Sequence, residues 1–286
     1  MLNLANKLNV AKPGRFVSGI AVFDSGLGSL SVVRALRRAA RGGGRGGARA
    51  DVIYFADTAS FPYGSKSKPQ LERIIRRTME GLQREFRPDA MVVASNTPTL
   101  VLDIRDGYRG AMLVAGVRPP LAEAAGLSGT GRIAVLGTAA GIRSAGLSRL
   151  IQRDAQQSGR CRVFRVDGSE LVGMVESGAF LKGGAIGPCR EAVRRVLGPA
   201  VSGHGVDVVV LSSTHLPFLL RAMESEYPGV TFVDPARRVA EWVLANYRGG
   251  PSGRNRLRIY ASGGCSALQE KLAKLGVRRV VRPLSL

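Results

Sequence analysis

Two segments of the chain bring small polar side chains to the end of an apolar run. The first reads VVASNTPTL (92–100) and the second reads VVVLSSTHLPFL (208–219). An apolar, β-branched run that stops abruptly in such residues predicts a buried parallel strand whose carboxyl end faces a ligand. Ser95 and Ser213 stand at these ends, so their two hydroxyl groups are the first candidates for chemistry.

Other polar residues follow predicted strands in the same way. Asp24 and Ser25 end a strand and precede Gly26 and Gly28, which open a helix. Read alone, this is a helix cap with turn glycines, although free backbone N–H groups at a helix start also suit a carboxylate. His215 lies two residues beyond Ser213 in the expected loop, where an imidazole can exchange protons near neutral pH.

Short apolar runs alternate with helical patterns along most of the chain, which predicts an α/β fold with doubly wound, parallel sheets. The expected strands are Ile20–Phe23, Val52–Phe55, Met91–Ala94, Met112–Ala115, Ile133–Leu136, Val163–Val166, Val208–Leu211, Thr231–Val233 and Leu257–Ala261. The expected helices include Leu71–Phe86, Ser144–Gln157, Pro188–Leu197 and Pro217–Tyr227.

A weak internal repeat predicts two pseudo-symmetric domains. IAVFDSG at Ile20 resembles IAVLGTAAG at Ile133, an offset of 113 residues, and Ser95 and Ser213 are 118 residues apart. We expect a flexible extension over 1–18, one α/β domain over 19–117 plus 234–286, and a second over 118–233. The active site is expected in the crevice between the domains, with strand ends from both.

The composition limits the class of protein. The 286 residues are 45% hydrophobic, which is typical of a globular chain. Only two histidines occur, and the three cysteines (Cys161, Cys189 and Cys265) are scattered, so we expect no metal site and no disulfide framework. No apolar run is long enough for a membrane span and no signal peptide is evident, so a cytoplasmic protein is expected.

The net charge of +21 is high for an enzyme of small metabolites. Such a surface attracts anions, including nucleic acid, and RGGGRGGAR (41–49) is a basic low-complexity loop. A solvated basic surface is the preferred explanation of the charge, because the sequence has no zinc finger, helix-turn-helix or aromatic RNA-binding signature. Nucleic acid therefore remains an alternative partner.

Seven motifs in a fixed order resemble a glutamate racemase of the aspartate/glutamate racemase superfamily. They are GIAVFDSGLGSLSVVRALRR (19–38), YFADTASFPYGSKS (54–67), VVASNTPT (92–99), RIAVLGTAAGIRS (132–144), ELVGMVESG (170–178), LSSTHLPFL (211–219) and FVDPARRVA (232–240). The resemblance implies inversion of the glutamate Cα without a cofactor, by two opposed thiols. It also implies that D-glutamate feeds peptidoglycan synthesis in the bacterial cell wall, and it leaves a homodimer open.

The resemblance assigns expected roles to residues that match its motifs. Ser95 and Ser213 occupy the positions of the catalytic thiols, and acid–base helpers are expected near them. Those helpers are Asp24, Glu176 and His215. Contacts to a small acidic amino acid or dicarboxylate are expected from Ser25, Tyr63, Gly64, Asn96, Thr97, Thr138 and Thr214. Each of these polar residues could instead only cap a helix or make a turn.

Several positions depart from the resembled pattern. Both thiols are serine, and none of the three cysteines lies in a catalytic motif. Ser212 stands where glycine is usual, Pro98 where alanine is usual, and Gly141 where threonine is common. These extra changes favour natural divergence over an engineered pair of serines.

Replacing sulfur by oxygen weakens the base that removes the α-proton. A thiol has a pKa of about 8.5, whereas a hydroxyl resembles water at about 15.7. A difference of roughly 7 corresponds to about 10 kcal/mol, and half of it would cost about 3–4 powers of ten in rate. We therefore expect weak or absent racemisation. The alternatives are a binding protein for an acidic ligand, an enzyme acting on a dicarboxylate by serine chemistry, and a nucleic-acid-associated protein.

Overall fold

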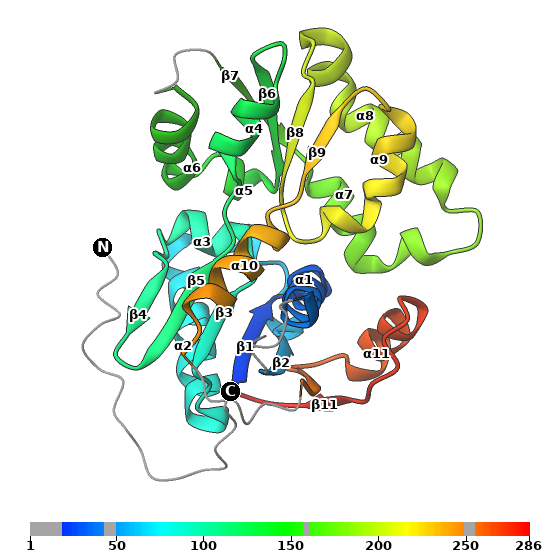
Figure 1. The fold of residues 1–286 in the computed structure, drawn as a ribbon. Coiled ribbons are helices and arrows are strands. Elements are labelled where there is room, and N and C mark those ends of the chain that lie inside the picture. The colour runs from blue at the N-terminus through cyan, green and yellow to red at the C-terminus, as the bar shows by residue number, and fades with distance from the viewer. Residues whose placement is uncertain (1–18, 43–49, 157–160, 249–254) are drawn as a thin grey trace. The chain divides into compact units, whose positions relative to one another are not determined.

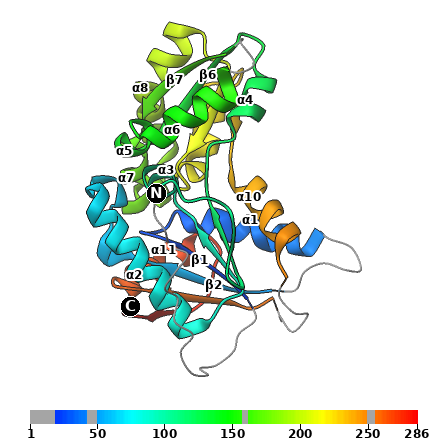
Figure 2. The same cartoon turned by 90° about the vertical axis from the view of Figure 1, so that its left-hand side faces the viewer.

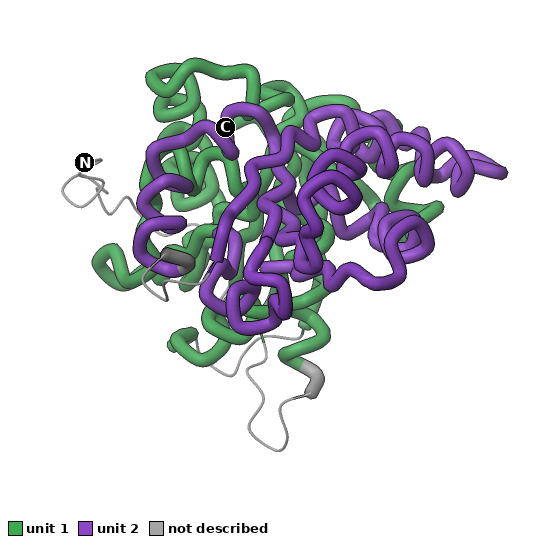
Figure 3. Tube along the Cα trace, turned by 90° about the horizontal axis from the view of Figure 1, so that it is seen from above, with its two compact units in different colours: residues 1–117, 236–286 green, residues 118–235 purple. Residues whose placement is uncertain are grey.

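The computed structural model describes residues 19–42, 50–156, 161–248 and 255–286 (Figure 1). The expected extension over 1–18 and most of the basic loop over 41–49 lie outside these described residues. The chain divides into two compact units (Figure 3), unit 1 with residues 1–117 and 236–286 and unit 2 with residues 118–235.

Unit 1 is built on a seven-stranded sheet with the order β11-β10-β2-β1-β3-β5-β4. Its strands are β1 (Gly19–Asp24), β2 (Asp51–Ala56), β3 (Ala90–Val93), β4 (Gly107–Arg109), β5 (Met112–Gly116), β10 (Leu257–Ala261) and β11 (Val281–Pro283). Its helices are α1 (Ser29–Gly42), α2 (Lys68–Phe86), α3 (Asn96–Val101), α10 (Ala236–Asn246) and α11 (Cys265–Lys274), with 3-10 turns η1 (Thr58–Ser60) and η2 (Tyr63–Ser65). All neighbouring strands are parallel except β4 and β5.

Successive side chains of the central strands of unit 1 point to opposite faces of the sheet, and both faces are buried. Ala21 and Phe23 of β1 pack in one hydrophobic cluster with Leu71 and Ile75 of α2. The neighbouring residue Ile20 faces the opposite side, where α1 and α10 pack against each other. Figure 2 shows α2 on one side of the sheet and α1 with α10 on the other. Burial on both faces explains why these strands read as continuous apolar runs.

Unit 2 is built on a four-stranded parallel sheet with the order β7-β6-β8-β9. Its strands are β6 (Arg132–Gly137), β7 (Arg162–Asp167), β8 (Val208–Ser212) and β9 (Thr231–Val233). Its helices are α4 (Leu121–Leu127), α5 (Ala139–Ile142), α6 (Ala145–Leu150), α7 (Ser169–Ser177), α8 (Ile186–His204) and α9 (Leu220–Glu226). Shorter turns are the π-helix η3 (Ile151–Gln156) and the 3-10 helices η4 (Ala179–Leu181) and η5 (Leu216–Leu219).

The two sheets share a strand order. The sequence β2-β1-β3-β5 in unit 1 matches β7-β6-β8-β9 in unit 2, and all eight strands in these two runs are parallel. The matching strands β1 and β6 begin 113 residues apart, at Gly19 and Arg132. The weak sequence repeat therefore coincides with a repeated topology, as expected for a pair of related α/β units.

The expected strands all occur, with ends shifted by one residue at most. Two short strands were not expected: β4, which is antiparallel to β5, and the edge strand β11. The helix expected over Ser144–Gln157 consists of two parts. Ser144 caps the α-helix α6, and the chain then continues as the π-helix η3. The helix expected over Pro217–Tyr227 begins with the 3-10 turn η5.

The edge strand β11 is closed on its outer side. The side chain of Gln269 on α11 accepts a hydrogen bond from the N–H of Val281 at 3.0 Å. Pro283, two residues on, has no N–H. Between them, Arg282 directs its N–H toward β10, because successive residues of a strand alternate sides. In the described part of the chain no helix is both long and apolar enough to span a membrane.

Candidate functional site

The polar residues of unit 1 gather at the carboxyl ends of β1, β2 and β3. Asp24 ends β1 and is buried, and one of its oxygens (Oδ1) accepts hydrogen bonds from the Ser25 backbone N–H at 2.6 Å and the Ser25 hydroxyl at 3.4 Å. The backbone N–H of Asp57, just beyond β2, donates to the Asp24 carbonyl at 2.7 Å. Two buried carboxylates therefore stand at the ends of two adjacent strands.

Asp57 is held by two hydroxyl groups. The Tyr63 hydroxyl donates to Oδ2 of Asp57 at 3.1 Å, and the Ser262 hydroxyl donates to Oδ1 at 3.0 Å. Burial first, and then the negative charges of Asp57 and Asp24, raise the pKa of Tyr63 well above its ordinary value. Tyr63 is only 2% exposed, so it is an inner support of this carboxylate and keeps its proton. Gly64 follows it in the turn η2 and is partly exposed.

The end of β3 carries Ser95, Asn96 and Thr97, all of them buried. Ser95 occupies the N-cap position of α3, but its side chain makes no capping hydrogen bond, so the simple capping explanation does not apply. The carbonyl of Ser95 accepts a hydrogen bond from the Thr99 hydroxyl at 2.7 Å. This bond holds the first turn of α3 in place and leaves the Ser95 hydroxyl outside the capping arrangement.

Asn96 is the most unusual residue of this strand end. It is 2% exposed, and neither its side-chain oxygen nor its nitrogen has a hydrogen-bond partner among the described residues. Leaving such a buried group unpaired typically costs about 1–3 kcal/mol. A carboxylate accepts from the amide nitrogen and an ammonium donates to the amide oxygen, so an amino acid can satisfy both atoms.

In unit 2, the ends of β6 and β8 supply the matching residues. Thr138 follows β6 and caps the short helix α5 by accepting from the Gly141 N–H at 3.3 Å. At the end of β8, Ser212, Ser213 and Thr214 are consecutive and all buried. The Ser213 hydroxyl oxygen accepts a hydrogen bond from the His215 backbone N–H at 3.4 Å. An N–H directed at this oxygen favours negative charge on it.

The buried His215 and the partly buried Glu176 form a pair beside Ser213. Nε2 of the imidazole lies 3.0 Å from Oε2 of Glu176, which is carried by α7, and their side chains are 5% and 14% exposed. A carboxylate at this distance favours a proton on Nε2 and orients the ring. Glu176 is therefore not a solvated helix residue but part of the surroundings of the second strand end.

Unit 1 thus brings together Asp24, Ser25 and Tyr63 by their hydrogen bonds and charges, and places Ser95, Asn96 and Thr97 at the next strand end. Unit 2 brings together Glu176, Ser213 and His215. Asp57 and Ser262 were not expected at this site from the sequence. The signal for Asp57 is its position directly after the apolar strand β2, which is the same signal that identified Asp24; Ser262 likewise follows β10 directly.

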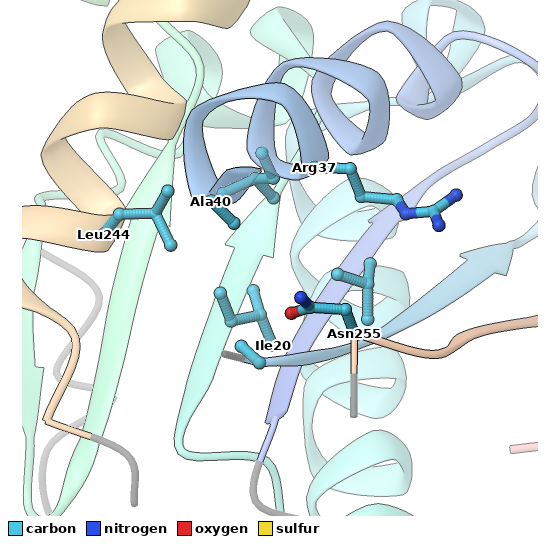
Figure 4. Close-up of a pocket in the computed structure, with 8 residues that line it drawn as sticks. Ile20, Arg37, Ala40, Leu244 and Asn255 are labelled. Carbon is cyan, nitrogen blue, oxygen red and sulfur yellow. The ribbon is translucent and has the colours of Figure 1, made fainter. Parts of the chain in front are cut away.

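A small hollow in unit 1 lies elsewhere. It is lined at the amino ends of β1 and β2 by Ile20 and Val52, with Leu244 of α10 and Asn255 nearby, and its volume is about 10 Å³ (Figure 4). This volume is that of about one water molecule. The guanidinium of Arg37 extends away from the other labelled side chains in Figure 4. The hollow is therefore separate from the strand ends that carry the candidate site.

Among the described residues, no three histidine, cysteine, aspartate or glutamate side chains group closely enough to hold a metal ion. The chemistry available at both strand ends is that of hydroxyl, carboxylate, amide and imidazole groups. These groups can bind a small zwitterion with an extra carboxylate, and they can move protons if a hydroxyl is assisted by a neighbouring base.

A family model described as Asp/Glu/Hydantoin racemase matches residues 20–242. The chain is 34% identical over 220 residues to a glutamate racemase from Desulforudis audaxviator, covering 76% of this chain and 74% of that one. It is 33% identical over 232 residues to a glutamate racemase from Mesorhizobium japonicum, covering 79% of this chain and 83% of that one.

Solved structures show the same architecture. A glutamate racemase from Thermus thermophilus, in complex with beta-chloro-D-alanine, is 29% identical and has a TM-score of 0.72, covering 94% of this chain and 97% of that one. A glutamate racemase from Bacillus anthracis has a TM-score of 0.76 at 24% identity, covering 94% and 98%. At the lower identity the likeness concerns the fold alone.

Proposed function

Because the chain belongs to the Asp/Glu/hydantoin racemase family, we propose that it binds glutamate or a similar small dicarboxylate and inverts it weakly or not at all. Inversion needs a proton acceptor on one face of the Cα and a proton donor on the other. The proposal assigns Ser95 of unit 1 to one face and Ser213 of unit 2 to the other. Any D-glutamate formed would serve peptidoglycan synthesis, as the family name implies.

The observation that carries ligand binding is the unpaired amide of Asn96. Both of its polar atoms are buried without a partner in the described protein, at a strand end in a family of amino-acid racemases. A ligand with an ammonium and two carboxylate groups supplies the missing partners. Related proteins support this ligand class, since solved glutamate racemases are described in complex with L-glutamate and with D-glutamate.

The weak reaction follows from the serines. Neither hydroxyl is a good base by itself, and the shift from thiol to hydroxyl costs several powers of ten in rate. Unit 2 carries partial compensation in the pair of His215 and Glu176, because an imidazole can accept a proton that a serine passes on. We expect residual proton exchange, if any occurs, to depend on this pair.

Calorimetric titration and heavy-water exchange test the proposal together. We expect L-glutamate or D-glutamate to bind the wild-type protein, and Asn96→Ala to weaken that binding about tenfold without lowering the free energy of unfolding. We expect α-proton exchange, followed by NMR, to be slow or undetectable. Failure of glutamate, aspartate and other dicarboxylates to bind would refute the ligand assignment, and rapid exchange would refute the weak-reaction assignment.

A second candidate function is association with nucleic acid, and one surface of unit 1 favours it. The segment from α11 through β11 carries five basic residues and one acidic residue, Glu270. The basic residues are Lys271, Lys274, Arg278, Arg279 and Arg282. Nη2 of Arg34 on α1 donates to the Leu275 carbonyl at 2.5 Å, which ties another arginine to this surface. Four of the five basic residues of the segment are exposed (Lys274, Arg278, Arg279 and Arg282), and clustered cations of this kind bind phosphate backbones.

Fluorescence anisotropy with a DNA duplex tests this second candidate. We expect binding at low salt that weakens steeply as salt is raised, and a loss of binding in Arg278→Glu with Arg279→Glu. A control with Arg73→Glu and Arg76→Glu, on α2, should keep most of the binding. No complex at low salt, or equal losses in the two variants, would exclude this surface as the nucleic-acid site.

A further inference from the structure

Ser212, the last residue of β8, holds a hydroxyl group that the fold does not use. The residue is 3% exposed, and its Oγ has no hydrogen-bond partner among the described residues. Five described residues have buried, unpaired side-chain atoms of this kind, and Ser212 is the only one of them in unit 2. It stands directly before Ser213, which the proposed function places at the ligand.

Another buried serine of unit 2 has a hydroxyl group whose hydrogen bonds stabilise the fold. Ser144 of unit 2 is also buried, and its hydroxyl donates to the Gly141 carbonyl at 2.7 Å. The same oxygen accepts from the Leu147 N–H at 3.1 Å and caps α6. Ser144 therefore has the partners that stabilise a buried hydroxyl, whereas Ser212 has the burial without them.

The neighbouring strand end offers the Ser212 hydroxyl no side-chain partner. Ser212 pairs with Gly137, the last residue of β6. A Cβ atom at Gly137 would lie 3.2 Å from the Ser212 Cβ, 2.9 Å from the Ser212 carbonyl oxygen and 3.3 Å from the Ile142 Cγ2. Such contacts are too close for an ordinary side chain, so the end of β6 places no side chain, and no hydrogen-bond partner, against Ser212 at this position. The apolar Ile142 offers no hydrogen-bond partner there.

We propose that the Ser212 hydroxyl donates a hydrogen bond to a carboxylate oxygen of the bound ligand, and so makes Ser212 a ligand-binding residue of unit 2. The inference rests on the proposed function and adds to it a hydroxyl that the family pattern does not assign. A buried hydroxyl without a partner destabilises the free protein, and a carboxylate oxygen supplies the missing acceptor. The hydroxyl is thus unsatisfied in the free protein and satisfied in the complex.

The test compares Ser212→Ala with Ser144→Ala in the full chain. Urea unfolding without ligand gives the stability, and calorimetric titration with L-glutamate and D-glutamate gives the dissociation constant. For Ser212→Ala we expect an unchanged or higher urea midpoint and a dissociation constant raised about tenfold, equivalent to about 1.4 kcal/mol. For Ser144→Ala we expect a lower midpoint and an unchanged dissociation constant.

The outcomes separate the inference from the proposed function. If the wild-type protein binds neither enantiomer, the proposed function fails before Ser212 is tested. If the wild-type protein binds and Ser212→Ala binds equally well, only the inference is overturned. A lower urea midpoint in Ser212→Ala with unchanged affinity would show a structural hydroxyl and also overturn it. Should Ser212→Ala fold poorly, Ser212→Gly removes the same hydroxyl and is held to the same two criteria.

Discussion

The two units share the same core of four parallel strands but differ in the polar groups at the carboxyl ends of these strands. Unit 1 places two hydrogen-bonded carboxylates, Asp24 and Asp57, at the ends of β1 and β2, and the unpaired amide of Asn96 directly after Ser95. Unit 2 places a buried imidazole, oriented by Glu176, two residues beyond Ser213. Unit 1 is therefore better equipped to hold a ligand, and unit 2 is better equipped to move a proton to or from a hydroxyl.

The opposite ends of the same strands are much more alike. Asp89 directly precedes β3 and accepts from the N–H of Gly19 at 2.9 Å. Asp207 directly precedes β8 and accepts from the N–H groups of Gly129 and Thr130 at 2.7 and 2.9 Å. In both units an aspartate accepts backbone hydrogen bonds at the start of the central strands. The two units thus share the same kind of aspartate hydrogen bond at the amino ends of their strands, whereas the polar groups at the carboxyl ends differ.

Restoring both thiols would produce the largest change. In Ser95→Cys with Ser213→Cys we expect racemisation of glutamate to rise by about three powers of ten or more, because a thiolate is far more accessible than an alkoxide. Circular dichroism of the amino acid and heavy-water exchange measure the gain. An inactive double variant would mean that Pro98, Ser212 or Gly141 has altered the site beyond its two hydroxyls.

The contribution of His215 and Glu176 can be measured in the same double-thiol protein. Glu176→Gln should lower kcat about a hundredfold, because the imidazole loses the carboxylate that orients it. Glu170→Gln is the matched control: Glu170 lies on the same helix α7 but is exposed and paired with Arg195. Equal decreases in kcat for the two substitutions would show that Glu176 has no special role in proton transfer, and would contradict the proposed difference between the units.

Tyr63 tests the carboxylate network of unit 1. Tyr63→Phe should lower the free energy of unfolding by about 1–3 kcal/mol, because Asp57 loses a buried hydrogen bond. The raised pKa of Tyr63 contributes stability that is complete below pH about 10 and is lost as the pH rises toward the folded-state value. Urea unfolding between pH 8 and 11 should therefore show a smaller alkaline loss of stability in Tyr63→Phe than in wild type.

The smallest effect is expected at the amino end of β8. Burial alone would raise the pKa of Asp207, but hydrogen bonds from Ser128, Thr130 and Gly129 outweigh it and lower the pKa. Its stabilising contribution is present above the unfolded pKa of about 3.9 and is lost as the pH falls through the lower folded value.

Asp207→Asn should therefore cost about 1 kcal/mol at pH 7 and less at pH 2–3, as measured by urea unfolding. Asp89→Asn is the matched variant in unit 1, where the aspartate occupies the corresponding position. A cost for Asp207→Asn that stays constant down to pH 2 would show that the negative charge contributes nothing and that the hydrogen bonds alone matter.

Much of this architecture could be predicted because buried parallel strands read as apolar runs. The strand ends at Ser95 and Ser213 followed from that pattern, and so did the repeated topology of the two units. The short strands β4 and β11 could not be predicted, because three-residue strands depend on the neighbours that they pair with.

Less of the candidate site than of the fold could be predicted from the sequence. The sequence gives no indication that Glu176 pairs with His215, because the two residues lie 39 positions apart along the chain. Asp57 could have been found by the rule that found Asp24, since both follow apolar strands. The missing partners of Asn96 and Ser212 could not be predicted at all, because satisfaction of a buried polar group depends on every atom packed around it.

The closed edge at β11 bears on how this chain behaves at high concentration. An open sheet edge is a template on which another chain can add a strand, and this route leads to aggregation. Here Gln269 occupies the Val281 N–H, and Pro283 offers no donor. Gln269→Ala would free one outward donor without touching either strand end that carries the candidate site. We therefore expect Gln269→Ala to lower the protein concentration at which aggregation begins while leaving the chemistry of the strand ends unchanged.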